Sequence, residues 1–263
     1  MPGAAQDSDR HKVVGEEHFR KQPNSDFHLG ERFEYRAHYG FLNAGKGSVE
    51  LADNKVVKKN RDCYKVAING RTTGVFALGV KVEDKWVSYI DESAIMPHEF
   101  YRDISENKYR LTETSYFNQE RGKVLVDSKK NGKDRKRETY EIPTYTQDMV
   151  SGYYYLRTLT YEDMEAGDII TMDAFFEDKL YDFQVRFEGR SVVKTKFGKV
   201  NAFKLKPVMP ENKLFKGEDA ITIWVSDDIN RVPLKIDVNM FIGIFEIEIV
   251  DYEGLREELN WAE

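Results

Sequence analysis

The segment GFLNAGKG, residues 40–47, contains the complete G-x-x-x-x-G-K pattern of a phosphate-binding loop. In such a loop a buried strand leads into the glycines, a helix follows, and a Ser or Thr directly after the lysine binds magnesium. Here both flanking segments alternate apolar and polar residues, as half-buried strands do, and Gly47 occupies the hydroxyl position. We therefore expect a glycine-rich bend or bulge and no nucleotide site. Phe41 and Leu42 then need either a core or a ligand to contact.

A pair of adjacent carboxylates, Asp227 and Asp228, lies beside Arg231 in the segment WVSDDINRVP. Adjacent carboxylates can hold a hard cation or serve in acid–base catalysis. The same residues, placed between two alternating segments, also suit a four-residue turn whose side-chain oxygens accept backbone N–H groups. We favour the turn, and a hydrolase that uses carboxylates such as Asp91, Asp227 or Asp228 is an alternative.

Motifs for metals and nucleophiles are sparse in this chain. His98 follows Asp91 in DESAIMPHEF, but the five histidines are scattered and show no metal-ligand spacing. Cys63 is the only cysteine, which excludes an intramolecular disulfide, and we expect it half-buried in a strand. There is no G-x-S-x-G elbow. We therefore expect no metal, no cofactor and no catalytic residue.

Composition and charge limit the class of protein. The 263 residues carry a formal net charge of −6, which argues against a nucleic-acid surface over the whole protein. Hydrophobic residues make up 40% and aromatic residues 13%, enough for a core and typical of sheet. No apolar run approaches the roughly 20 residues of a membrane helix. The basic run SKKNGKDRKRE contains Asn131-Gly132, which predicts a solvated hairpin tip in preference to an anionic-surface contact.

Alternation with a period of two dominates after residue 30. It runs through FEYRAHY, DFQVRF and FEIEI, and short connections favour antiparallel pairing. We predict a mainly β fold, a strongly curved antiparallel sheet or open barrel-like architecture with one central packing helix. The expected organisation is a flexible leader (1–30), a single β-rich domain (31–254) and a C-terminal tail (255–263). Two lobes, 31–145 and 164–254, joined by the helix are the alternative.

The helix is predicted over about residues 148–160, in the segment YTQDMVSGYYYLRTL. Asp148 suits the N-cap, and Met149, Tyr153 and Leu156 recur at helical spacing. A shorter helix is expected near residues 74–82. Three consecutive tyrosines, residues 153–155, cannot share one helix face, so they either pack on the sheet or form a lid over an apolar cavity.

Several segments resemble one family. They are GERFEYRAHYGFLNAGKGSVEL near the start, SYIDESAIMPHEFYRDI in the middle, and FGKVNAFKLKP, ITIWVSDDINRVPLKIDV and GIFEIEIVDYEG in the C-terminal half. Together they are similar to the exported bacterial family called domain of unknown function 3108, over about residues 30–254. The stretch from Trp224 to Pro233 is the most specific part. The resemblance implies a Gram-negative envelope protein of antiparallel sheet, with no established activity and no catalytic residues.

We expect a non-catalytic binding or carrier protein for a lipidic or other apolar small molecule. The protein is expected to be periplasmic or associated with the outer membrane, because small residues before Gln6 resemble the remnant of a removed signal peptide. No nucleic-acid partner is expected, and a protein partner is left open. The alternative is an envelope module that binds glycan or protein through exposed Tyr and Trp. The expected ligand-binding residues are Phe41, Leu42, Tyr153, Tyr154, Tyr155 and Trp224.

Overall fold

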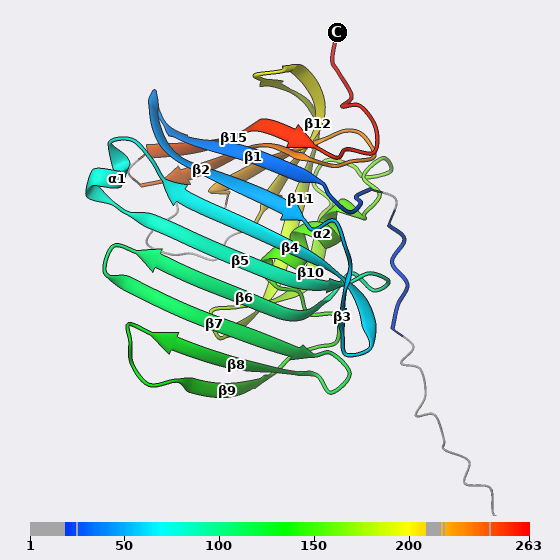
Figure 1. Ribbon diagram of the computed structural model, residues 1–263. Coiled ribbons are helices and arrows are strands. Elements are labelled where there is room, and N and C mark those ends of the chain that lie inside the picture. Colours follow the sequence, from blue (N-terminus) through cyan, green and yellow to red (C-terminus); the bar gives the residue numbers. More distant parts are fainter. Residues whose placement is uncertain (1–18, 25, 209–216, 218, 242) are drawn as a thin grey trace, which may run out of the picture.

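The computed structural model describes residues 19–24, 26–208, 217, 219–241 and 243–263. Over these residues the chain forms one sheet of fifteen strands and two short helices (Figure 1). Neighbouring strands pair antiparallel throughout, which confirms the mainly β prediction. No helix in this described part is long and apolar enough to cross a membrane.

The elements follow one another with short connections. The first group is β1 (Arg32–Tyr39), β2 (Leu42–Leu51), β3 (Val56–Lys58), β4 (Arg61–Thr72), α1 (Phe76–Gly79), β5 (Val82–Asp91), β6 (Pro97–Glu106), β7 (Tyr109–Asn118), β8 (Lys123–Lys130) and β9 (Lys136–Glu141). The second group is α2 (Met149–Arg157), β10 (Ile169–Phe176), β11 (Lys179–Thr195), β12 (Gly198–Pro207), β13 (Ile221–Ser226), β14 (Pro233–Met240) and β15 (Gly243–Glu253).

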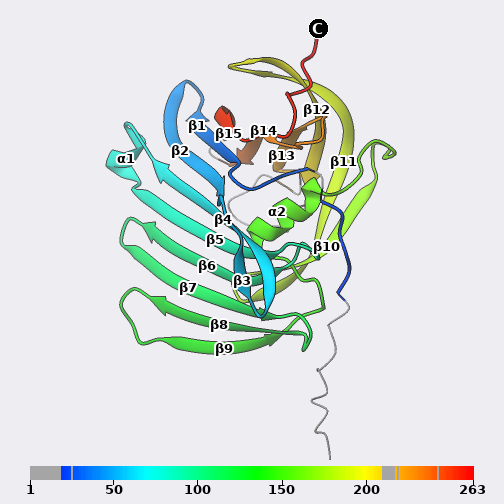
Figure 2. The same ribbon diagram turned by 45° about the vertical axis from the view of Figure 1, so that its right-hand side comes forward.

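The strand order places the first strand beside the last. From one edge the sheet runs from β10 to β15 in chain order, then β1, β2 and β4, and finally from β5 to β9 in chain order. Strand β3 lies off this path and pairs with β4. The sheet curves so strongly that α2 lies inside it (Figure 2). The turns after β1, β4, β6, β8 and β14 lie at one end, which we call the α1 end. The chain enters β1 and leaves β15 at the opposite end, the α2 end.

The side of the sheet that faces α2 is called the inner face. Ser88 of β5 points to it, because its hydroxyl lies 2.6 Å from the carboxylate of Asp148 at the start of α2. Alternation along β5 places Trp86 and Ile90 on the same side. Cross-strand register then adds Ile68, Val49 and Phe33 in one row over β4, β2 and β1.

Helix α2 begins with the predicted N-cap. The Asp148 carboxylate accepts the N–H groups of Val150 (2.7 Å) and Ser151 (2.8 Å), and the Ser151 hydroxyl accepts the Asp148 N–H. This is a capping box. The helix ends at Arg157, earlier than predicted, because the Thr158 N–H bonds the Tyr155 carbonyl and tightens the last turn. The second predicted helix is confirmed as the single turn α1.

The edge strands β9 and β10 approach each other through side chains, and the segment before α2 forms a short bridge to β10. Gln147, just before α2, pairs parallel with Ala174 of β10. Phe175 of β10 is buried against Phe117 of β7 and Tyr140 of β9, with ring centroids 6.3 and 5.3 Å apart. The curved sheet is thereby closed into a barrel-like shape.

Both terminal segments pack at the α2 end. Phe27 is 1% exposed and contacts the rings of Tyr64 and Tyr154, so the predicted flexible leader does not hold for residues 26–30. A single Phe in a polar stretch has no periodicity that could have indicated its burial. Residues 1–18 lie outside the described residues. In the C-terminal segment Leu259 is buried, and Trp261 forms a bridge with β12.

The β1–β2 connection is the predicted glycine-rich bend. Gly40 has a φ of 57°, a backbone conformation that glycine adopts without strain. The pairing then shifts register between Ala37 and His38, which marks a β-bulge. The Lys46 side chain is exposed on strand β2, and no helix follows it. The segment therefore lacks the framework of a phosphate-binding loop.

Candidate functional site

At the α2 end the inner face is filled by its own side chains. Phe33, Val66, Ile90 and Phe117 are each 0% exposed and belong to one apolar core. Tyr154 of α2 is also 0% exposed and packs into this core. The helix therefore fills this end of the barrel, and the packing there corresponds to the helix-on-sheet interpretation.

At the α1 end the inner face is less completely covered. Strand register aligns two rows of apolar side chains over β13, β14, β15 and β1. They are half-buried, although they point to the concave side of the sheet. The first row is Ile223, Ile236, Ile247 and Ala37, and the second row is Ile221, Val238, Phe245 and Tyr39.

An aromatic cluster links this inner face to α1. The Tyr39 ring lies 5.0 Å from that of Phe245 and 6.0 Å from that of Phe76 in α1. Gly243 makes this packing possible, since a Cβ there would lie 2.7 Å from the Tyr39 ring. Phe76 thus anchors α1 onto the inner face at the mouth of the barrel.

Trp86 also points to the inner face, and its indole ring lies next to Gly70, which has no side chain. A Cβ on Gly70 would lie 3.8 Å from its indole ring, which is ordinary contact distance. Further along, Arg102 and Glu113 form a buried bidentate ion pair with distances of 2.8 and 3.1 Å. The inner face therefore has an apolar side over β13–β15 and β1 and a polar group over β6 and β7.

The structure does not bring the six predicted ligand-binding residues together. Tyr153 and Tyr155 are half-buried at the α2 end, where Tyr154 donates a 2.7 Å hydrogen bond to Glu31. Phe41 and Leu42 lie at the opposite end, with 94% and 37% of their surface exposed. Trp224 is on the outer face, near the ammonium groups of Lys204 and Lys235.

The inner-face rows had a signal in the sequence. The alternation in FEIEI predicts that Phe245, Ile247 and Ile249 point inward, and all three do. Only Ile249 is fully buried, however, at 1% exposure. Alternation identifies a face of a strand but does not show which part of that face another element covers.

A fully buried ion pair joins α2 to the segment before β1. The Arg157 guanidinium binds both carboxylate oxygens of Glu31, with a distance of 2.9 Å between Nη2 and Oε2, and also donates to the Asn230 carbonyl. Arg157 and Glu31 side chains are 1% and 2% exposed. Because the Arg157 and Glu31 charges are paired and hydrogen-bonded, this is a structural centre of the α2 end.

Asp148 is a buried carboxyl whose acidity is strongly altered. Burial raises its pKa to about 6, against the opposing effect of hydrogen bonds from Ser88 and from the backbone of Ser151 and Val150. A raised carboxyl pKa is also a property of catalytic acids. Here the carboxyl caps α2 inside the core and has no access to a substrate.

Asp91, a candidate carboxylate for a hydrolase, is bound by side chains of β4 and β6 and by the backbone of its own turn. It pairs with Arg61 and His98 and accepts the N–H of Ala94. Burial alone would raise its pKa, but these hydrogen bonds hold the pKa well below its usual range. Asp91 thus remains ionised and bound to its neighbours.

The Asp227–Asp228 pair is organised as the predicted turn. Asp228 accepts from the Ser226 hydroxyl and the Asn230 N–H, at 2.8 and 3.0 Å, and also from the C-terminal segment. Asp227 pairs with Arg190 on the surface. The two carboxylates therefore stabilise a turn and do not converge on an open cleft.

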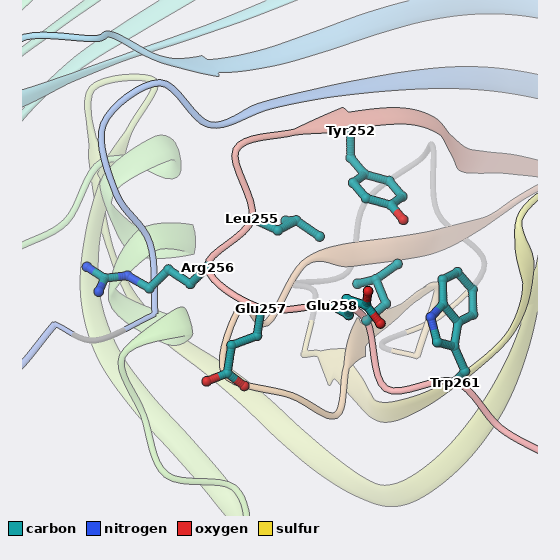
Figure 3. Close-up of a pocket in the computed structure, with 7 residues that line it drawn as sticks. Tyr252, Leu255, Arg256, Glu257, Glu258 and Trp261 are labelled. Atoms are coloured by element: carbon teal, nitrogen blue, oxygen red, sulfur yellow. The ribbon is translucent and has the colours of Figure 1, made fainter.

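Two surface hollows among the described residues offer no better site. One, of 480 Å³, lies within the C-terminal segment, where Tyr252, Leu255 and Trp261 surround it while Arg256 and Glu257 point away (Figure 3). The other, of 640 Å³, includes outward-pointing charges of both signs from β1, β2, β4, β5 and β6. Neither presents an acid and a base aimed at a common point.

The fold and this inner face define a barrel-like, mainly β protein. A crystal structure described as "Beta-barrel-like Protein of Domain of Unknown Function DUF1849 from Brucella abortus" is similar, with a TM-score of 0.57. The match has 10% sequence identity and covers 89% of this chain and 100% of that chain, so it shows the fold alone. The model of the family "Protein of unknown function (DUF3108)" matches residues 34–250, and the chain belongs to this family, as the resemblance predicted. No curated protein matches the sequence.

Proposed function

We propose that the protein binds an apolar small molecule on its inner face at the α1 end, without catalysing a reaction. The observation that carries this proposal is the pair of half-buried apolar rows over β13, β14, β15 and β1. An apolar ligand placed against these rows would remove their remaining surface from water. That gain is roughly 25 cal/mol for each Å² of apolar surface buried.

Two further observations support a binding role over a catalytic one. The carboxylates that a hydrolase would need, Asp91 and Asp228, are occupied by structural hydrogen bonds. Cys63 is buried, and burial raises its pKa to about 12, which leaves it a poor nucleophile. We also propose an envelope location, as the family resemblance implies, and subcellular fractionation of the source bacterium tests it.

The three tryptophans allow ligand binding to be located. Trp86 lies on the inner face, whereas Trp224 lies on the outer face and Trp261 in the C-terminal segment. A protein that keeps only Trp86 (Trp224→Phe, Trp261→Phe) should show saturable fluorescence quenching by a bromine-substituted stearic acid. A protein that keeps only Trp224 should show much weaker quenching, because bromine quenches at contact range.

A neighbouring pair of substitutions supplies the control. Val238→Asp places a charge in the apolar row and should weaken the fatty acid's binding by at least about tenfold. Asn239→Asp adds the same group on the outward side of the same strand and should leave binding unchanged. The proposal fails if Trp86 is not quenched, or if both single-tryptophan proteins are quenched alike.

A further inference from the structure

Large apolar side chains stand exposed at the α1 end of the sheet. They come from three connections, the β1–β2 turn, the segment that contains α1, and the β14–β15 turn with the start of β15. We call them the apolar rim, which consists of Phe41 (94% exposed), Leu78 (89%), Phe241 (66%), Val75 (61%), Ile244 (50%) and Val80 (49%).

The apolar rim is continuous because of the strand order. β14, β15, β1, β2, β4 and β5 are successive neighbours in the sheet, so their three connections are adjacent. Phe76 holds α1 against Tyr39 and Phe245, which leaves Leu78 of the same turn directed outward. A cluster of exposed apolar side chains on one end of a molecule is typical of an interaction surface.

Positive charge continues from the apolar rim along the same end. The next connections in the sheet are the start of β5, the β6–β7 turn and the β8–β9 hairpin, which lie in line with α1 (Figure 1). We call their exposed lysines the basic arc, which consists of Lys81, Lys108, Lys129, Lys130 and Lys133. Within the described residues none of the five forms an ion pair.

The basic arc is a local exception in an acidic protein. The chain has a net charge of −6, yet these three connections place five exposed lysines beside three exposed acids, Glu83, Glu106 and Asp134. Lysines near a membrane surface are attracted to anionic lipids, at about 1 kcal/mol each, or about a fivefold change in affinity. The arc therefore complements a negatively charged partner.

We propose that the α1 end docks on a lipid bilayer that contains anionic lipids. The apolar rim enters the interface between headgroups and acyl chains, and the basic arc contacts lipid phosphates. Single apolar side chains on successive turns suit a flat, fluid surface, and neither of the two hollows described above is lined by them. This docking goes beyond ligand binding and stands whether or not the inner face holds a ligand.

Flotation with vesicles tests the proposal. The wild-type chain should float with vesicles of equal parts phosphatidylethanolamine and phosphatidylglycerol, and bind pure phosphatidylcholine vesicles more weakly. A Phe41→Trp variant gives a direct reading of insertion, because this 94% exposed position tolerates a larger ring. Its emission, corrected for the parent protein, should shift to the blue when the anionic vesicles are added. Val57→Trp, on an exposed position at the α2 end, should not shift.

Matched substitutions separate the two parts of the surface. Phe41→Ser with Leu78→Ser should weaken vesicle binding by at least about tenfold, while Val57→Ser with Val192→Ser should not. Lys108→Gln with Lys133→Gln should weaken binding to anionic vesicles by about 25-fold, and raised salt should also weaken it. Lys194→Gln with Lys199→Gln, near the β11–β12 turn at the α2 end, is the matched control.

Two results would overturn the proposal. One is a wild-type chain that stays unbound to the anionic vesicles. The other is concentration-dependent self-association in sedimentation velocity that the Phe41→Ser, Leu78→Ser variant abolishes while vesicle binding is unaffected, which would assign the rim to contact between copies. Quenching of Trp86 by the brominated fatty acid should persist in this variant, so failure of docking and failure of ligand binding are distinguishable.

Discussion

Asp148 shows how one residue can be both a helix cap and a titrating group inside a core. Its carboxyl is 1% exposed and accepts three hydrogen bonds from protein groups. Capping favours the ionised form, whereas removal from water favours the neutral form. Burial is the larger effect, and it raises the pKa to about 6.

The stability of the protein should therefore depend on pH through Asp148. The pKa in the folded state lies above the ordinary value of 3.8, so the folded protein holds a proton that the unfolded chain releases. The resulting stabilisation is complete below about pH 4 and is lost as the pH rises through about 6. It amounts to about 1.4 kcal/mol for each unit of pKa difference.

Urea unfolding at a series of pH values measures this dependence against Asp148→Asn, which keeps a good N-cap. The stability of the wild type relative to the variant should decline between pH 4 and 6 and level off above. Asp134→Asn, at an exposed position in the β8–β9 turn, is the matched control substitution. Parallel curves for wild type and Asp148→Asn would contradict the assignment.

At the scale of elements, the position of helix α2 depends more on the Arg157–Glu31 ion pair than on the helix's own hydrogen bonds. Nine residues make a marginal helix in isolation. Arg157 at its end binds Glu31 before β1 and the Asn230 carbonyl between β13 and β14. Three parts of the chain far apart in sequence are thus joined at one guanidinium.

Removing one partner of this pair should be costly. Arg157→Met leaves the Glu31 charge buried without a cation, and we expect a loss of about 3–5 kcal/mol in the free energy of unfolding. The double variant Arg157→Met, Glu31→Gln should lose less than the sum of the single variants. Arg190→Met, which breaks the exposed pair with Asp227, should cost at most about 1 kcal/mol. Additive single and double losses in denaturant unfolding would show that the two groups are not coupled.

At the scale of the whole molecule, closure of the barrel depends on few contacts. β9 and β10 are the two edges of the strand order, and Phe175 packs against rings from β7 and β9 across the gap. Side chains here replace the ladder of backbone hydrogen bonds that joins the other strands.

Phe175→Ala should lower the free energy of unfolding by about 3–5 kcal/mol, because it removes the ring contacts between the two edge strands and leaves a cavity there. Hydrogen exchange should rise first in β9 and β10, the strands that the contact joins. Leu180→Ala, at a 43% exposed position on β11, should change the unfolding free energy by less than about 0.5 kcal/mol. Uniform exchange over all strands in the Phe175 variant would argue against a local role in closure.

The sequence predicts the elements well and their assembly less well. Alternation in FEYRAHY and FEIEI predicts half-buried strands, and Asp148 marks the start of α2, because these signals are local. The burial of Phe27 has no local signal, since it depends on where α2 and β4 bring Tyr154 and Tyr64.

The candidate sites are harder still to predict, because they are made by topology. Phe41 and Leu78 lie on one surface because β1, β2 and β4 are adjacent in the sheet. Phe241 lies on the same surface because β15 pairs with β1. In the sequence these residues are isolated apolar positions in three connections. The inner rows likewise depend on which part of the sheet α2 covers.

The pairing of β1 with β15 has a consequence for how the chain reaches its native state during synthesis. Arg32 lies opposite Glu253, so β1 must wait for a strand that the ribosome makes much later. Until then β1 has an open edge, which is a hazard for aggregation. Contacts of such large sequence separation also slow folding. A sheet that stays open until β15 is made leaves the chain, for that interval, in a form that a chaperone can still bind.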